Sequence, residues 1–316
     1  MSAGALLTQL AAVVVAIAVA PLFLGWVNIC RAWLQNRSAP PLMLPYRNIA
    51  KLLHKEAVIA HDASPLFRFT PYLVFATMAT AAAIIPTLGT ALAFSRAADA
   101  IALVGLFATA RVFSALAAMD TGTAFGTLGA RREMMIGFLA EPALLMVFFN
   151  ASLIAGSTEL AAIAEAHQHH SLSVHPSLAF AALAFVMVLL AENARIPIDN
   201  PATHLELTMI HEAMVLEYSA RHLALIEWAN ALKLFNYACM GFALFLPWGL
   251  IAAIDSPALA LRTLALLGTK LVLAGVALAL VEAINAKIRI FRAPEFLALA
   301  FMLAVLGLLV RLLVQG

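Results

Sequence analysis

Residues 4–29 read GALLTQLAAVVVAIAVAPLFLGWVNI, an apolar run without a single charged side chain. About 20 apolar residues suffice for a helix to cross the hydrocarbon core of a bilayer. No Lys or Arg precedes Arg31, so the segment lacks the positive start of a signal peptide and predicts a retained transmembrane helix. Further runs of the same kind follow, and together they decide the fold class.

The composition agrees with a membrane protein. Of the 316 residues, 64% are hydrophobic and 11% are charged, against roughly a quarter charged in a soluble domain. No internal repeat or low-complexity linker divides the chain, which predicts a single all-α integral membrane domain over residues 1–316. About eight transmembrane helices are expected, at residues 4–29, 71–94, 98–118, 134–156, 177–192, 223–251, 263–284 and 296–314.

The lysines and arginines predict the orientation. Loops after the first, third, fifth and seventh spans hold six, two, two and three of them, whereas the opposite loops hold only Arg96 and Arg262. Cytoplasmic loops carry the excess of Lys and Arg. Both termini are therefore predicted to face outward, and the multi-pass chain is expected in the inner (plasma) membrane.

The net charge and the cysteine content argue against two kinds of function, nucleic-acid binding and the binding of an iron–sulfur cluster or zinc ion by this chain alone. A net charge of +2 is too small to suggest a nucleic-acid partner. Cys30 and Cys239 lie far apart and form no C-x-x-C motif, which excludes an iron–sulfur cluster or zinc ribbon held by this chain alone.

A short amphipathic surface helix is predicted after the first span. Pro45 can open it, because its missing N–H needs no partner in a first turn. The basic Arg47, Lys51 and Lys55 lie away from an apolar stripe with helical spacing. Two placements are open: the headgroup boundary, or packing on protein. The stripe consists of Tyr46, Ile49, Ala50, Leu53 and Ala57.

Ionisable residues also lie where lipid should exclude them. At about 3 kcal/mol each, exposing six of them to lipid would cost roughly 18 kcal/mol, more than the typical net stability of about 5–15 kcal/mol. They are therefore predicted to face the bundle interior, pair or touch water. Static pairs that fix helix register are the alternative to proton or ion passage, and passage is favoured for the set. The six are Arg111, Glu141, Glu227, Lys233, Lys270 and Glu282.

Polar residues cluster on one predicted helix face and in one loop. Glu227, Asn230, Lys233 and Tyr237 fall within an arc of roughly 120°. The loop between the fifth and sixth spans is the densest polar stretch, and its leucines and methionines favour a partly buried funnel over a solvated surface. Its titratable residues include Glu192, Asp199, His204, Glu206, His211, Glu212 and Glu217.

Several motifs are interpreted as structural. A cluster of histidines in an outward loop is interpreted as solvated rather than metal-binding, and His211-Glu212 lacks the H-E-x-x-H spacing of a zinc site. Thr121-Gly122-Thr123-Ala124-Phe125-Gly126 predicts a tight turn with close helix packing rather than a phosphate cradle. The clustered histidines are His167, His169, His170 and His175.

The loop motifs resemble a known family. Glu192-x-x-Arg195-x-Pro197-x-Asp199, then Glu206-Leu207, Glu217-Tyr218 and Glu227-Trp228-Ala229-Asn230, resemble the signature of the respiratory complex I subunit 1 family. Upstream, Gln35-Asn36-Arg37 and Lys51-Leu52-Leu53-His54-Lys55-Glu56 resemble its first cytoplasmic loop. The resemblance covers residues 31–295.

Within that family the chain is most similar to the hydrogenase branch, the membrane subunits of formate hydrogenlyase and hydrogenase-4 type (group 4 nickel–iron hydrogenase) complexes. The residues concerned are Asp120 to Gly126, Arg132-Glu133-Met134 and Glu141-Pro142. The stretch between Glu206 and Glu217 is about three residues longer than in complex I, and no glycine precedes Pro40. Both departures argue against a quinone site.

The resemblance implies a non-catalytic membrane anchor and coupling subunit of an oxidoreductase complex. Its implied partners are hydrogenase-like large and small subunits, a ferredoxin-like iron–sulfur subunit and antiporter-like membrane subunits. They would carry the iron–sulfur clusters and nickel–iron centre, while this chain binds no cofactor or metal and couples electron transfer to proton or sodium movement. The alternatives are the quinone-binding subunit 1 of NADH–quinone oxidoreductase and a stand-alone ion-coupled secondary transporter, which usually shows paired repeats.

Two residue sets carry these expectations. The expected proton pathway is Glu141, Glu192, Asp199, Glu206, Glu212, Glu217, Glu227, Lys233, Lys270 and Glu282. Docking of the redox arm is expected at Arg37, Lys51, Lys55, Arg131, Arg132 and Arg195.

Overall fold

The computed structural model describes residues 3–94, 99–169, 176–195, 210–253, 256–286, 288 and 292–315. Within these ranges the chain forms eleven helices and two isolated β-bridges. Three helices are short: α2 (Leu44–Leu53), α6 (Leu160–His169) and α8 (His211–Val215). The long ones are α1 (Ala3–Leu34), α3 (Pro65–Ile84), α4 (Ala100–Asp120), α5 (Ala124–Ala155), α7 (Pro176–Glu192), α9 (Ala220–Phe245), α10 (Pro257–Ile284) and α11 (Ala293–Gln315).

The long helices confirm the prediction of an all-α multi-pass membrane protein. Among the described residues, α1, α3, α4, α5, α10 and α11 are long and apolar enough to cross a membrane. α7 is apolar but has 17 residues. α9 carries the charged Glu227 and Lys233, and packs in the interior against α1, α2, α3, α6 and α7. All eight occur in the predicted order.

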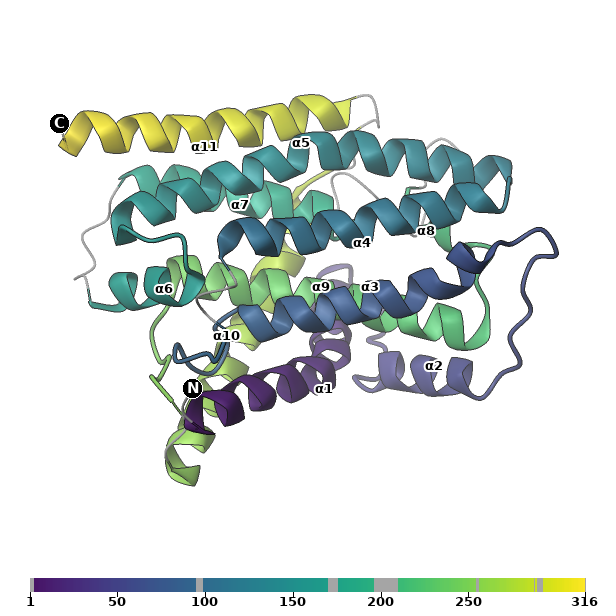
Figure 1. Ribbon diagram of the computed structural model, residues 1–316, viewed down its shortest axis with the longest axis horizontal. Helices are drawn as coiled ribbons and strands as arrows, with labels where there is room; N and C mark the ends of the chain where they lie inside the picture. The colour runs from purple at the N-terminus through teal and green to yellow at the C-terminus, as the bar shows by residue number, and fades with distance from the viewer. Residues whose placement is uncertain are drawn as a thin grey trace.

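Both chain ends lie at the same end of the bundle. Figure 1 shows the N- and C-termini on the left, with α2 and the turn between α4 and α5 on the right. This arrangement is what an even number of spans requires. Which end faces the cytoplasm stays the prediction of the Lys and Arg distribution.

The helices stack in a continuous series across the bundle. α11 packs on α7 and α5, α5 on α4, α4 on α3, and α3 on α9. At the opposite edge α1 packs on α9 and α10, as Figure 1 shows. Gly275 of α10 lets this contact close, because a Cβ there would lie 2.8 Å from Nε1 of Trp26 on α1. α9 thus lies at the centre. On its polar face Tyr237 is buried and Lys233 is half-buried, while Asn230 is exposed toward a cavity.

Two span boundaries differ from prediction by ten residues, each for a local reason. α5 begins at Ala124, ten residues earlier than expected, so Arg131 and Arg132 belong to a helix rather than a loop. Thr123 caps it by accepting a hydrogen bond from the Gly126 N–H at 3.3 Å, and Gly122 turns the chain with φ 67°. This confirms the predicted tight turn. α3 ends at Ile84, because Ile85 precedes a proline and is extended.

The amphipathic helix is confirmed as α2, with Pro45 in its first turn, but it ends at Leu53, so Lys55 and Ala57 lie beyond it. It packs on α9 and α1, and Ile49 is buried. Met43 and Leu53 remain exposed. Of the two open placements, packing on protein therefore applies to the face that carries Ile49.

One predicted loop is helical. His167 and His169 lie in α6 rather than in a solvated loop, because Leu160, Ile163 and Ala164 repeat at helical spacing and are buried. Nδ1 of His167 lies 2.7 Å from the Ile163 carbonyl oxygen. His170 and His175 lie outside the described residues.

Candidate functional site: a buried charge cluster

Arg111 of α4 stands at the centre of a group of acids inside the bundle. The residue is 5% exposed. Its Nε lies 3.3 Å from Oε1 of Glu133 on α5, while Nη1 and Nη2 donate to Glu141 of α5 and Glu192 of α7. Charges taken out of water must be paired, and one guanidinium here serves three carboxylates.

Two further residues complete what we call the Arg111 cluster. Nζ of Lys233 on α9 lies 2.9 Å from Oε2 of Glu192, and Nε2 of His211 on α8 lies 3.3 Å from Oε2 of Glu133. Five helices therefore contribute to one site. Its members are Arg111, Glu133, Glu141, Glu192, His211 and Lys233.

A glycine makes room for the central cation. A Cβ added to Gly137 would lie 2.6 Å from Cδ and 2.8 Å from Cζ of Arg111. Gly137 stands one helical turn from both Glu133 and Glu141, so the spacing i, i+4, i+8 places acid, gap and acid along one side of α5. The guanidinium lies against that gap.

The Arg111 cluster contains more acids than permanent cations. Arg111 and Lys233 supply two positive charges against three carboxylates. The third positive charge is available only when His211 is protonated. A sheltered cluster favours neutrality, so this arrangement favours holding one exchangeable proton.

A second group of ion pairs has more cations than carboxylates. Glu282, at the end of α10, lies 3.2 Å from Nη1 of Arg195 and 3.6 Å from Nη1 of Arg31. We call these three residues the Glu282 cluster. Burial lowers the pKa of the Arg195 guanidinium and Glu282 opposes that shift, so the group stays a cation.

A cavity of about 460 Å³ lies against both clusters. We call it the entrance cavity. Its wall is formed by α1, α2, α9, the end of α7 and the start of α8, and includes Arg31, Ile49, Glu192, His211, Glu227 and Lys233.

The structure places the predicted pathway residues at several different sites. The structure brings Glu141, Glu192 and Lys233 together in the Arg111 cluster, and Glu212 and Glu227 line the entrance cavity. Glu217 is half-buried between α8 and α9. Glu282 belongs to the neighbouring cluster. Asp199 and Glu206 lie outside the described residues.

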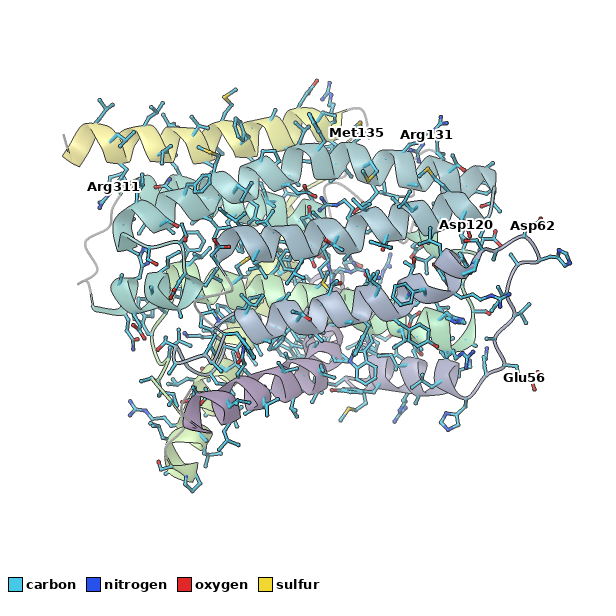
Figure 2. All side chains as sticks on the ribbon, viewed as in Figure 1. Glu56, Asp62, Asp120, Arg131, Met135 and Arg311 are labelled. Carbon is cyan, nitrogen blue, oxygen red and sulfur yellow. The ribbon has the colours of Figure 1, made fainter. Side chains whose placement is uncertain are left out.

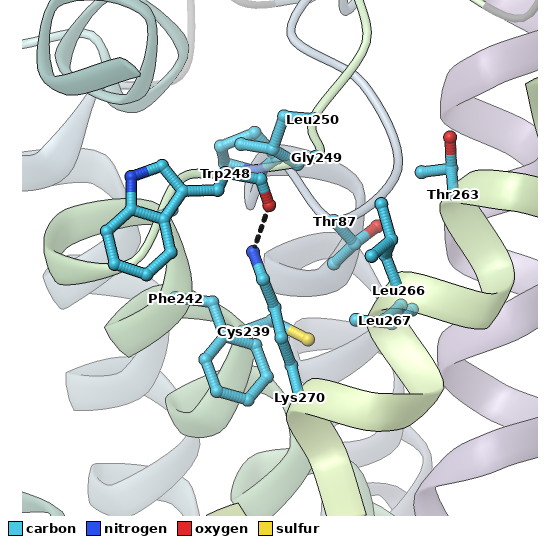
Figure 3. Close-up of a pocket in the computed structure, with 12 residues that line it drawn as sticks. Thr87, Cys239, Phe242, Trp248, Gly249, Leu250, Thr263, Leu266, Leu267 and Lys270 are labelled. Atoms are coloured by element: carbon cyan, nitrogen blue, oxygen red, sulfur yellow. Dashed lines mark hydrogen bonds between the residues drawn. The ribbon is translucent and has the colours of Figure 1, made fainter. Parts of the chain in front are cut away.

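Lys270 stands apart from the other pathway residues. Its Nζ donates to the carbonyl oxygens of Leu246 at 2.6 Å and Trp248 at 2.5 Å, just beyond the end of α9. Figure 3 shows the ammonium pointing at the Trp248 carbonyl, above Phe242 and Cys239. Backbone dipoles at a helix C-terminus stabilise a cation, so Lys270 joins α10 to the end of α9.

Most of the predicted docking residues are accessible. Arg37, Lys51, Lys55 and Arg131 are exposed, and Arg132 is half-exposed. In Figure 2, Arg131 projects from α5, and Glu56 and Asp62 project from the loop after α2 at the end of the bundle opposite Arg311. Arg195 differs, because it is 9% exposed and its guanidinium contacts Glu282.

Three site residues and one buried arginine lie outside the predicted pathway and docking sets. Glu133 fell one residue outside the predicted span, Arg31 was assigned to a loop, and the contact of His211 could not be foreseen. The acid–glycine–acid spacing on α5 was the available signal for Glu133. Arg311 of α11 is also buried, at 8% exposed.

The sequence matches a family model along almost its full length. The model is described as NADH dehydrogenase, and residues 7–313 match it. The chain belongs to the NADH dehydrogenase family. The predicted resemblance to complex I subunit 1 is thereby confirmed.

Two curated proteins of Escherichia coli (strain K12) are similar to this member of the NADH dehydrogenase family. Formate hydrogenlyase subunit 4 is 34% identical over 278 residues, which cover 88% of this chain and 89% of the relative. Hydrogenase-4 component C is 34% identical over 241 residues, 76% of this chain and 75% of the relative. The predicted similarity to the hydrogenase branch is therefore confirmed.

One solved structure shares the fold of this protein. It is a chain of the membrane-bound sulfane sulfur reductase, an archaeal respiratory membrane complex. The TM-score is 0.82 at 22% identity, and the match covers 95% of this chain and 97% of the other. At this identity the likeness concerns the fold.

Proposed function

We propose that this chain is the membrane anchor and coupling subunit of a hydrogenase-type, complex I-related respiratory complex. It links a cytoplasmic redox arm, whose iron–sulfur and nickel–iron centres lie on partner subunits, to proton or sodium translocation. The observation that carries this proposal is the Arg111 cluster: three carboxylates around one guanidinium, inside a membrane-type helix bundle and open to a cavity. The relatives named as hydrogenlyase and hydrogenase components support it.

The bundle end that carries α2 suits contact with the redox arm. Lys51 of α2, Lys55 just after it and Arg131 of α5 are exposed there, and Arg37 is exposed in the segment between α1 and α2. In the proposed complex this end faces the hydrogenase-like large and small subunits and the ferredoxin-like subunit. The exposed apolar sides of α10 and α11 face lipid and the antiporter-like membrane subunits.

Coupling is electrostatic in this proposal. A charge change at the nearest redox centre alters the protonation of the carboxyls at the entrance cavity, Glu212 and Glu227. The change passes through Glu192 to the Arg111 cluster, and through Arg195 to Glu282. From there, in the proposed complex, it reaches the antiporter-like membrane subunits. Each step is a local change in charge that biases its neighbour.

The test uses the purified complex reconstituted in sealed vesicles. Glu192→Gln and Glu227→Gln should each reduce the number of ions moved per electron to background. Glu165→Gln, at an exposed acid on α6, is the matched control and should leave the ratio at the wild-type value. Normal ratios in both site variants would contradict the proposed function.

The entrance cavity favours a second candidate, a quinone-binding subunit. Its volume of about 460 Å³ lies within the range of about 300–1,000 Å³ typical of small-molecule sites, and it lies beside α2. A quinone analogue that inhibits the purified complex in competition with ubiquinone-1 would support this candidate. Insensitivity to such inhibitors supports the coupling subunit without quinone.

Extraction in mild detergent separates both candidates from a stand-alone transporter. The coupling subunit should co-purify with iron–sulfur proteins, whose visible absorption weakens on reduction. A transporter would migrate alone on a native gel.

A further inference from the structure

His211 is the residue at which the entrance cavity meets the Arg111 cluster. It is the first residue of α8, and its side chain is 19% exposed. It lines the entrance cavity on one side. On the other side it lines a cavity of about 60 Å³, here called the inner cavity, together with Arg111, Glu133 and Tyr218. Its imidazole therefore has access both to water and to the buried acids.

The partner of His211 is an acid with little other access to solvent. Nε2 lies 3.3 Å from Oε2 of Glu133, whose side chain is 5% exposed, while Oε1 of Glu133 faces Nε of Arg111 at 3.3 Å. One oxygen of this carboxylate thus meets a permanent cation, and the other meets an imidazole that is a cation only when protonated. Imidazole changes its charge near neutral pH.

Charge balance gives that imidazole a specific role. Without His211, two cations face three carboxylates in the Arg111 cluster. Protonated His211 makes the charges equal. The same equality results when the proton lies on Glu133 and His211 is neutral.

We propose that His211 is the residue through which the Arg111 cluster gains and loses its charge-balancing proton, with the entrance cavity as the route to water. This proposal rests on the proposed coupling function and assigns the step at which a proton enters the acid network. A proton from cavity water binds the imidazole. Transfer to Glu133 then breaks the N–H bond at Nε2 and forms an O–H bond at Oε2, which leaves His211 neutral.

Charged groups on each packed element influence this step. Glu133 stabilises the imidazolium directly, whereas Arg111 and Lys233 oppose it. The charged and titratable groups that line the two cavities around His211 are Glu133 of α5, Arg111 of α4, Lys233 and Glu227 of α9, Glu192 of α7, Glu212 of α8, Tyr218 before α9, Arg31 of α1 and Arg195 after α7.

The first experiment measures titration on the purified full chain in detergent. Infrared spectra of ¹⁵N-histidine-labelled protein, recorded from pH 5 to 9, should show an imidazole signal that His211→Gln removes and His61→Gln retains. The His61 side chain is fully exposed, so it serves as the matched control. In Glu133→Gln the midpoint should fall by about 1–3 pH units, because an opposite charge at this distance favours the charged form. An unshifted midpoint in Glu133→Gln would overturn the proposal.

The second experiment measures ion movement per electron in the reconstituted complex. His211→Arg keeps a cation beside Glu133 but cannot release its proton, so the complex should assemble while the ratio falls at least about tenfold. His211→Gln should lower the ratio similarly, and His61→Gln should not.

The two proposals fail in different ways. If both His211 variants pump normally while Glu192→Gln does not, the coupling function stands and His211 is not the entry point. If Glu192→Gln also pumps normally, the coupling function itself fails, whatever the infrared titration of His211 shows.

Discussion

The Arg111 cluster and the Glu282 cluster are neighbours with opposite imbalances. Glu192 of the first and Arg195 of the second stand three residues apart, at and just after the end of α7. The first has three carboxylates for two permanent cations, and the second has one carboxylate for two arginines. Of the two clusters, only the Arg111 cluster therefore has an excess carboxylate that an added proton can neutralise. In the Glu282 cluster the carboxylate already faces two arginines, so it needs no proton. The excess positive charge is tolerated because the side chain of Arg31 is 27% exposed and can be solvated.

Removing the central cation of the first cluster should have the largest effect. Arg111→Met leaves three carboxylates with Lys233 alone, and breaking a buried pair in this way costs about 3–5 kcal/mol. Denaturant unfolding of the purified chain in detergent measures the loss. Arg195→Met is the matched comparison and should lose less, because Arg31 still faces Glu282. Equal losses would remove the distinction between the clusters.

Removing the acid of the second cluster should cost less than Arg111→Met. In Glu282→Gln two arginines face each other across a neutral amide, and we expect a loss of about 2–3 kcal/mol. The double variant Glu282→Gln with Arg31→Gln should recover part of that loss, because it removes the repulsion. A double-mutant cycle on the same unfolding assay measures the coupling. Strictly additive losses would show that Arg31 does not belong to the cluster.

A methyl group placed against Arg111 should have a still smaller effect. Gly137→Ala inserts a carbon within 2.8 Å of Cζ of Arg111, and overpacking of this kind costs about 1–2 kcal/mol. The control is Gly105→Ala on α4, where no atom lies within 4 Å of the added carbon; it should be neutral or slightly stabilising. Destabilisation by Gly105→Ala of the same size would show that the loss in Gly137→Ala does not come from the contact with Arg111.

Lys270 should give the smallest effect. It serves as a reference because, among the described residues, its ammonium contacts backbone carbonyl groups rather than a carboxylate. Its ammonium is held by two carbonyl groups, so Lys270→Met should lose about 1 kcal/mol of stability. Arg262→Met, at an exposed site on the same helix, should have almost no effect. Thermal unfolding in detergent resolves the pair. A loss from Lys270→Met comparable with that from Arg111→Met would mean that backbone dipoles at this half-buried site stabilise the protein as much as the buried ion pairs do.

Apolar run lengths were sufficient to predict the helices but not their polar ends. The eight long helices, the place of α2 and the common end of both termini agree with prediction. The start of α5 does not, because Arg131, Arg132 and Glu133 lower the local hydropathy although Thr123 caps the helix before them. Buried polar residues at a helix end therefore resemble a loop when only hydropathy is considered.

The sequence predicted that charged residues would be sheltered between helices, but not which of them would contact each other. The cost of exposing charge to lipid predicted that Glu141 and Lys233 would be sheltered, and both lie in the Arg111 cluster. That Lys233 contacts Glu192 depends on the rotation of α9 against α7, which the pattern of either helix alone does not determine. His211 was even less accessible to prediction, because five-residue α8 carries too little periodicity to orient a side chain.

The short length of α7 has an electrical consequence. Seventeen residues extend about 25 Å at 1.5 Å per residue, less than the roughly 30 Å of a bilayer's hydrocarbon core. Where α7 ends, Glu192 lies beside the entrance cavity and the charged groups of both clusters. If water fills this cavity within the hydrocarbon layer, the transmembrane voltage falls over the remaining thickness, and an ion that starts at Glu192 crosses a shorter dielectric barrier than one that starts at the lipid headgroups.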